Sequence, residues 1–379
     1  MDNRLIIYDT TLRDGGQGEG IAFSADDKIK IAQRLDAFGA DYVEGGWPGS
    51  NPKDLEFFRR AAVLPWKNAR IAAFGSTRKV DLSAEEDPNL RALLEAGTPV
   101  TTLFGKSWDL HVIAGLRTTL EENLHLIRSS VAFLHDHGKE VVYDAEHFFD
   151  GYRADPAYAL ETLAAAREAG AACLVLCDTN GGTLTLPLVE IIRTVMHRFP
   201  DIPLGLHAHN DSDTAVANSL AALAMGVHHI QGTINGYGER CGNANLCSII
   251  AGAALKLKVP LAPAVSLEEL TPLSRYVSEV TNLPHREESP YVGRSAFAHK
   301  GGIHVSAIQR DHRTYEHIEP ERVGNHRRVL VSDQSGQSNI LYKAGEMGVD
   351  LCSDRAEIRK LVEQLKRMEH LGYQYEGAD

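Results

Sequence analysis

A short apolar segment, a loop and an amphipathic stretch recur about every thirty residues through the first two-thirds of this chain. Several of the apolar segments do not alternate with polar residues, which is typical of parallel strands covered by helices. About eight such units within roughly 250 residues predict an α/β fold, a (β/α)8 TIM barrel, with a doubly wound open sheet as the alternative. The expected strands are Leu5–Leu12, Tyr42–Trp47, Arg70–Phe74, Val100–Phe104, Glu140–Glu146, Cys173–Thr179, Leu204–His209 and Ile230–Asn235.

Capping residues indicate where the intervening helices begin and end. Ser24 followed by acidic residues is typical of a helix N-terminus, and Gly39 is typical of a helix stop. Further helices are expected over Glu121–His137, Pro156–Ala169 and Asp213–Met225.

Polar residues stand at the carboxyl ends of many of the expected strands. In a barrel all of these ends converge on one mouth, whereas an open sheet does not easily explain them, so they favour the barrel. The residues are Arg13, Asp14, Glu44, Glu146, Thr179, His207, His209 and Asn235.

The chain changes character after about Val259, where prolines punctuate the sequence and a segment rich in His, Lys and Arg follows. Helical patterns are expected within it at Leu267–Asn282, Gln337–Met347 and Asp354–Leu371. We therefore predict a catalytic TIM-barrel domain over residues 1–258. Residues 259–379 are predicted to form a linker and a smaller, mainly helical subdomain that contributes to the active site.

Asp14, His207 and His209 form a candidate metal site at the barrel mouth. The two histidines are at positions i and i+2, so in a strand both imidazoles point to the same face. One carboxylate with two imidazoles and no thiolate favours Mg²⁺, Mn²⁺ or Zn²⁺. Asn243 could add an amide oxygen, and a helix cap is an equally good interpretation of that residue. A histidine pair alone arises by chance; its combination with Asp14 at strand ends favours metal binding.

Four other residues complete the candidate chemistry. Arg13 suits a substrate oxygen that becomes negatively charged, and Thr179 could donate a hydrogen bond to a substrate carboxylate or cap a loop. Glu146 is a candidate general base, or the orienter of one, with an ion pair to a nearby histidine as the competing interpretation. Asp144 shares the strand face of Glu146, so both are expected to point into the barrel.

The overall composition excludes several other classes of protein. A net charge of -12 argues against a general nucleic-acid binder. The sequence has neither a signal-peptide pattern nor a long apolar span, so we expect a cytoplasmic protein without a membrane partner. Its five cysteines include no CxxC pair and imply no disulfide framework; Cys173 and Cys177, four residues apart, are expected to share a strand face as small core residues.

Three segments together resemble the signatures of one enzyme family: Asp9-Thr10-Thr11-Leu12-Arg13-Asp14-Gly15, His207-x-His209-Asn210, and Asn235-Gly236-Tyr237-Gly238-Glu239-Arg240-Cys241-Gly242-Asn243. This family is that of the acyl-CoA-condensing isopropylmalate, homocitrate and citramalate synthases, which have a metal-dependent TIM barrel. Segments 17–20, 45–54 and 298–304 are most similar to the bacterial citramalate synthases.

The resemblance implies a Claisen-type condensation of acetyl-CoA, the co-substrate, with a 2-keto acid. Pyruvate is the expected keto acid, with 2-isopropylmalate and homocitrate synthesis as alternatives. The residues Asp144, Leu103 and Phe104 are expected near the keto acid's side chain, where apolar groups suit a methyl group. His304 and Tyr315 match positions thought to assist deprotonation of acetyl-CoA. A homodimer is implied as well.

Two other functions compete with this one. A metal-dependent acyl-CoA lyase or aldolase would use a related barrel, but it would not need the appended region that carries His304 and Tyr315. A catalytically inactive barrel, kept as a binding subunit, would be expected to have lost part of the set formed by Arg13, Asp14 and Glu146 with the two histidines.

Overall fold

The computed structural model describes residues 3–349, 351 and 355–375. It divides into two compact units. The first unit comprises Met1–Ser266 and Leu273–Pro284, and the second comprises Leu267–Pro272 and His285–Asp379. Within the described residues, no helix has the length and apolar character needed to cross a membrane.

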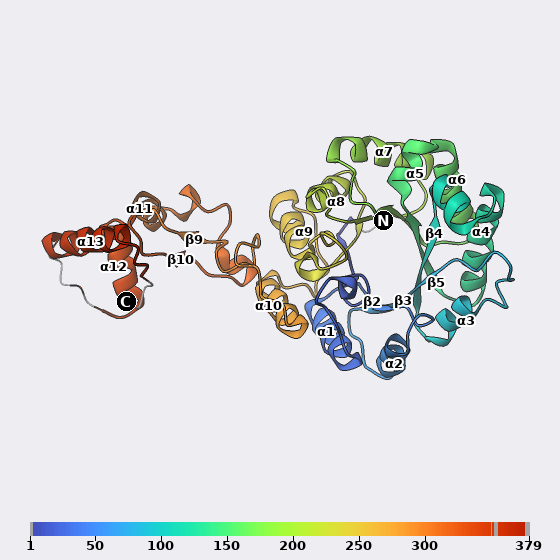
Figure 1. Cartoon of the computed structure of the whole chain (residues 1–379), viewed down its shortest axis with the longest axis horizontal. Coiled ribbons are helices and arrows are strands. Elements are labelled where there is room, and N and C mark those ends of the chain that lie inside the picture. Colours follow the sequence, from blue (N-terminus) through green and yellow to red (C-terminus); the bar gives the residue numbers. More distant parts are fainter. Residues whose placement is uncertain (1–2, 350, 352–354, 376–379) are drawn as a thin grey trace. The chain divides into compact units, whose positions relative to one another are not determined.

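The first unit is a closed barrel of eight parallel strands, each paired with the next along the chain, and β8 with β1. Figure 1 shows helices around the outside of these strands. The predicted TIM barrel is therefore confirmed. The strands are β1 Ile6–Asp9, β2 Tyr42–Gly46, β3 Arg70–Ser76, β4 Val100–Lys106, β5 Glu140–Glu146, β6 Cys173–Asp178, β7 Leu204–Ala208 and β8 His229–Gly232.

Helices between the strands cover the barrel. The helix α1 begins after Ser24, whose side chain and Asp27 form a capping box, and it ends at Gly39 in the left-handed conformation, as predicted. The helices are α1 Ala25–Phe38, α2 Pro52–Ala61, α3 Pro88–Glu95, α4 Leu120–Asp136, α5 Phe148–Ala154, α6 Pro156–Glu168, α7 Thr185–Arg198, α8 Ala215–Ala224 and α9 Leu246–Gly252. A further helix, α10 Leu270–Thr281, follows them, and its residues up to Pro272 group with the second unit.

Two strands are shorter than their apolar runs suggest. The strand β1 ends at Asp9 because the backbone NH groups of Arg13, Asp14 and Gly15 all turn back to the carbonyl of Thr10. The strand β8 ends at Gly232, and Asn235 just beyond it has a φ of 63°. These strand ends are therefore turns, and a turn frees consecutive side chains from strict alternation.

The strand β2 contains an irregularity that shapes the mouth of the barrel. Its register with β3 shifts between Glu44 and Gly46. Gly46 has a φ of 142°, and a Cβ placed there would lie 2.4 Å from the carboxyl carbon of Asp54. The absence of a side chain thus lets Asp54 accept hydrogen bonds from the backbone NH of Trp47 and from Asn51.

The interior of the barrel is filled by small and β-branched side chains from different strands. Cys173 and Cys177, predicted to share a strand face, both lie in this cluster. The described cysteines are all free, and Cys352 lies outside the described residues. The cluster consists of Tyr8, Ala72, Val100, Val142, Cys173, Val175 and Cys177.

The second unit contains a short parallel pair, β9 Ala298–His299 and β10 Arg328–Val329, with helices α11 Gly302–Arg310, α12 Gln337–Glu346 and α13 Arg355–His370. Buried Glu316 links the two strands, because it contacts His299 at 3.1 Å and accepts two hydrogen bonds from Arg327, at 2.6 and 2.5 Å.

The division between the units differs from the predicted boundary at residue 258. Residues 259–266 and 273–284 group with the barrel. Hydrogen bonds explain this grouping: the NH of Leu5 donates to the carbonyl of Pro260, and Asn235 exchanges hydrogen bonds with Ser274 in α10.

Candidate active site

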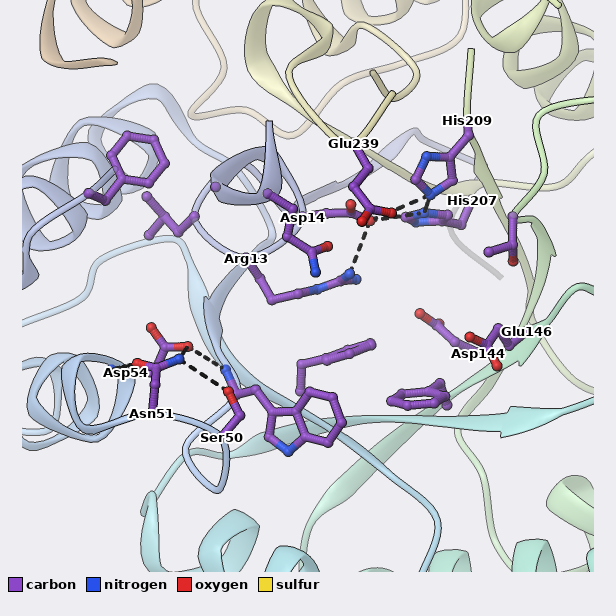
Figure 2. A pocket seen from close by; sticks show the side chains of 18 of the residues that line it. Arg13, Asp14, Ser50, Asn51, Asp54, Asp144, Glu146, His207, His209 and Glu239 are labelled. Carbon is purple, nitrogen blue, oxygen red and sulfur yellow. Dashed lines mark hydrogen bonds and ion pairs between the residues drawn. The ribbon is translucent and has the colours of Figure 1, made fainter. Parts of the chain in front are cut away.

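Asp14, His207 and His209 converge at the carboxyl ends of β1 and β7 (Figure 2). Asp14 Oδ2 lies 3.2 Å from His207 Nε2 and 3.8 Å from His209 Nε2. The two Nε2 atoms are 3.4 Å apart. All three side chains are buried, and their three candidate donor atoms lie within 4.8 Å of one another. The geometry therefore brings together the three residues that the sequence predicts as metal ligands.

The charges of this cluster suit a cation. Burial lowers the pKa of His209 to about 3, so that its imidazole is neutral at ordinary pH. Burial would raise the pKa of Asp14, but Arg13 and the two histidines outweigh it and hold that pKa well below its usual range. Burial likewise opposes a charged His207, yet Asp14 raises its pKa overall. The ionised carboxylate of Asp14 and the neutral imidazole of His209 are suitable donors for a divalent metal, and His207 can join them when the ion replaces its proton.

The amide of Asn243 supports the same interpretation. Asn243 is 3% exposed and forms an isolated bridge with His209. Within the described residues, neither polar atom of this amide has a hydrogen-bond partner. Buried polar groups are normally paired, so an unpaired amide beside His209 fits a site completed by a metal or its bound water.

Arg13 is held firmly beside this cluster. Its Nη1 lies 3.0 Å from Asp14 Oδ2 and its Nε lies 2.6 Å from Glu44 Oε2, while the guanidinium carbon is 3.7 Å from the centroid of the Phe74 ring. Glu44 is fully buried and also accepts hydrogen bonds from Tyr8 at 2.6 Å and Thr10 at 2.5 Å. The sequence placed Glu44 at a strand end but assigned it no role; the structure shows that it orients Arg13.

A cavity of about 370 Å³ opens beside Arg13 and the cluster. Figure 2 shows Asp144 and Glu146 on one side of it and Ser50, Asn51 and Asp54 on another. Its lining comprises Leu12, Arg13, Asp14, Gly16, Gln17, Phe23, Lys28, Trp47, Ser50, Asn51, Lys53, Asp54, Phe74, Phe104, Asp144, Glu146, Cys177, Thr179, His207, His209, Glu239 and Arg240.

Aromatic rings form the apolar wall of this cavity. Phe74 and Phe104 are stacked with centroids 5.2 Å apart, and Trp47 meets both edge-on. The prediction for Leu103 is corrected here, because alternation along β4 turns Phe104 inward and Leu103 toward the outside. Leu103 is fully buried and does not line the cavity. Of the three residues predicted near the keto acid's side chain, Phe104 and Asp144 line the cavity and Leu103 does not.

Asp144, Glu146 and Thr179 all line the cavity. Glu146 forms an ion pair with Lys106 at the end of β4, so the partner predicted to be a histidine is a lysine. The hydroxyl of Thr179 accepts a hydrogen bond from the backbone NH of His147 at 2.9 Å, which leaves its own proton available to donate. Burial raises the pKa of Asp144 to about 7.

His304 and Tyr315 lie in the second unit. Their rings stack with centroids 4.1 Å apart, and both side chains are exposed. The structure thus brings these two predicted residues together within their own unit. Their action on the barrel's substrate stays a prediction.

Several cavity residues were missed by sequence reasoning. The loop after β2 carries Trp47 and Asn51, and buried Asp54 in the first turn of α2 pairs with Lys28 of α1. The family resemblance included segment 45–54. Neither an aromatic residue such as Trp47 nor a buried lysine such as Lys28 has a sequence spacing that marks it as part of a cavity. Glu239 stands beside the glycine-rich turn and was likewise assigned no role.

Comparisons with known proteins agree with this architecture. The HMGL-like family model matches residues 4–277, and a model described as a homocitrate synthase post-HMGL domain matches residues 291–372. The chain is 53% identical to the (R)-citramalate synthase of Aquifex aeolicus, over 100% of this chain and 72% of that protein. It is 56% identical to that of Geobacter sulfurreducens, over 98% and 70%.

More distant relatives share the family and the fold. A 2-isopropylmalate synthase of Sulfolobus acidocaldarius is 33% identical over 98% of this chain and 93% of that protein. The HMG-CoA lyase structure of Bacillus subtilis aligns with a TM-score of 0.63 and 22% identity, over 75% of this chain and 95% of that one. Identity this low supports the barrel fold alone. The chain belongs to the HMGL-like family, among the acyl-CoA-condensing synthases that its three signature segments resemble.

Proposed function

We propose that this protein condenses acetyl-CoA with pyruvate and that water then hydrolyses the thioester, which gives (R)-citramalate and CoA. The observation that carries the proposal is the contrast in identity: 47–56% to citramalate synthases, against 33–35% to 2-isopropylmalate and homocitrate synthases. The post-HMGL region at residues 291–372 favours a synthase over a lyase. The preserved set of Arg13, Asp14 and the two histidines disfavours an inactive scaffold.

Asp14, His207 and His209 would hold the divalent ion, with Asn243 beside it. We favour Mg²⁺ or Mn²⁺ as the ion, with Zn²⁺ as the alternative that the imidazoles permit. Such an ion supplies Lewis-acid polarisation of the keto group.

Arg13 is placed to stabilise the oxygen that becomes negatively charged when the new carbon–carbon bond forms. Its Nε and Nη1 are engaged by Glu44 and Asp14. Within the described part of the chain its Nη2 donates no hydrogen bond, so that NH2 group can donate to the substrate. Two anchors and the Phe74 ring fix the guanidinium before substrate arrives, so little reorganisation is needed.

Thr179 would donate a hydrogen bond from its hydroxyl to the carboxylate of the keto acid, because its oxygen already accepts one from the His147 NH. Glu146 would act in the transfer of the methyl proton of acetyl-CoA, with Lys106 setting its position. We assign assistance in that proton transfer to His304 and Tyr315 as well. In a homodimer they could come from the partner subunit.

The cavity wall favours a small keto acid. Phe74, Phe104 and Trp47 leave an apolar surface that suits a methyl group. One additional methylene is discriminated by only about 1–3 kcal/mol in such a pocket, so slow turnover of 2-ketobutyrate is expected.

The deciding experiment measures CoA release from acetyl-CoA with pyruvate, 2-ketoisovalerate or 2-ketoglutarate, each with Mn²⁺ or Mg²⁺. The proposal expects preference for pyruvate and loss of activity when a chelator is added. Preference for another keto acid would retain the chemistry and refute the substrate. No release with any of them would favour the lyase or scaffold alternatives.

A further inference from the structure

A buried glutamine connects the two sides of the cavity. Gln231 lies in β8 and is fully buried in the barrel. Its Oε1 is 2.9 Å from Nδ1 of His207, and its Nε2 donates to Asp144 Oδ1 at 2.9 Å. His207 and Gln231 are register partners on neighbouring strands, whereas Asp144 stands on β5. The glutamine therefore spans the barrel interior from a proposed metal ligand to the substrate wall.

The direction of this chain of hydrogen bonds follows from its chemistry. The structure turns the NH2 group of Gln231 toward Asp144, which suits the carboxylate form of Asp144 because that form can only accept. The amide oxygen then faces His207, where it can only accept, and Nδ1 must carry the imidazole proton. Nε2 of His207, 3.2 Å from Asp14 Oδ2, is therefore the nitrogen that can offer its lone pair to a cation.

The reversed amide would not suit a metal site. Its NH2 group would face Nδ1, which would then need a lone pair, and a neutral imidazole would carry its proton on Nε2. That proton would stand where a cation must bind. A hydrogen bond to the outer nitrogen is the usual means by which proteins fix the tautomer of a metal-binding histidine.

We propose that Gln231 is a positioning residue: it holds His207 in the tautomer that binds the metal and holds Asp144 against the keto-acid side of the cavity. This inference rests on the proposed function, because it takes the metal ligands and the keto acid from it. Gln231 is not among the residues that line the cavity, so its effect must pass through His207 and Asp144.

Two substitutions separate the hydrogen bond of Gln231 to His207, called the His207 arm, from its hydrogen bond to Asp144, called the Asp144 arm. Gln231→Met keeps the length of the side chain and removes both hydrogen bonds, so the affinity for Mn²⁺, titrated without substrate, should fall about 10- to 100-fold. Gln231→Glu keeps an acceptor for His207 but places a carboxylate against Asp144. Its Mn²⁺ affinity should stay within a few-fold of the native value, while KM for pyruvate rises at least about tenfold.

The double variant Q231E/D144N tests the Asp144 arm by rescue. It exchanges the amide and the carboxylate across the same hydrogen bond, so a donor again faces an acceptor. Its KM for pyruvate should be lower than that of Q231E alone, a coupling that general damage to the barrel would not produce. Asn218→Leu is the matched control, since Asn218 is a buried amide in α8 that bonds to the Thr183 carbonyl outside the cavity.

The outcomes decide each arm separately. Native Mn²⁺ affinity in Q231M, with a native circular dichroism spectrum, would overturn the His207 arm. A native KM in Q231E, or no rescue in the double variant, would overturn the Asp144 arm. If Q231M does not fold, Gln231→Asn carries the same expectation, because its shorter amide cannot reach both partners. If the native protein releases no CoA, the proposed function fails, yet the Mn²⁺ titration still tests the tautomer.

Discussion

His229 should make the stability of this barrel depend on pH in a way that can be measured. It lies at the start of β8, 6% exposed, with its ring centroid 5.2 Å from that of Tyr8 and 5.7 Å from that of Tyr42. Burial lowers the pKa of His229 to about 4. In the unfolded chain a histidine titrates near 6.5, so between these values the unfolded state binds the proton more strongly.

The free energy of unfolding of the barrel should fall as the pH falls below about 6.5. Because the folded pKa of His229 is the lower one, its contribution to stability is complete above about pH 6.5 and is lost as the pH falls toward 4. A difference of about 2.5 pKa units corresponds to about 3 kcal/mol in full, and about 2.5 kcal/mol of it is lost between pH 7 and 4.5. Stability here means the free energy of unfolding of the barrel.

The assay is urea unfolding at pH 7 and 4.5, for the native chain and for His229→Phe. Other groups titrate in both proteins, so the comparison isolates His229: the variant should lose about 2.5 kcal/mol less than the native chain over this interval. His125→Gln, which changes an exposed histidine of α4, should behave like the native chain. Equal losses in the native chain and His229→Phe would refute the reasoning.

Three further predictions concern the active site. His207→Ala should abolish Mn²⁺ binding and turnover while the urea midpoint changes little, and activity restored by excess metal would contradict its role as a ligand. Glu44→Gln should lower the free energy of unfolding by about 3 kcal/mol and reduce kcat, because it removes the buried charge that anchors Arg13; unchanged stability and kcat would contradict that anchor. His304→Ala should lower kcat far more than it raises KM for pyruvate, and a pure rise in KM would make His304 a binding residue.

The fold was predictable because two local signals agree through the first 250 residues or so. The apolar runs locate all eight strands, and capping residues such as Ser24 and Gly39 set helix ends that need no tertiary context. The strand ends were predicted less well. After Thr10 and Gly232 backbone turns replace the strand pairing. Whether a residue is apolar or polar does not predict a turn that is stabilised by distant contacts.

The site was predictable where a residue's chemistry is uncommon. A carboxylate and paired histidines at strand ends identify Asp14, His207 and His209 because few other patterns combine them. Leu103 was predicted at the cavity together with its neighbour Phe104, because a continuously apolar strand does not reveal which of its faces turns inward. Glu44 and Gln231 could not be assigned from sequence, because their importance depends on what stands across the barrel from them.

The balance of charges in the barrel mouth explains why the buried contact between Glu44 and Arg13 matters. Asp14 and Glu44 both contact Arg13, and His209 is neutral because burial lowers its pKa to about 3. Asp14 also raises the pKa of His207, so the two carboxylates offset at most two cationic groups, and this end of the cavity has no net positive charge to attract an anionic keto acid. A divalent ion at Asp14 would make this end positive, so the same carboxylates that orient Arg13 would make binding of the acid depend on prior binding of the metal. Preorganisation of Arg13 and selectivity for the metal-loaded state thus arise from one arrangement of buried charge.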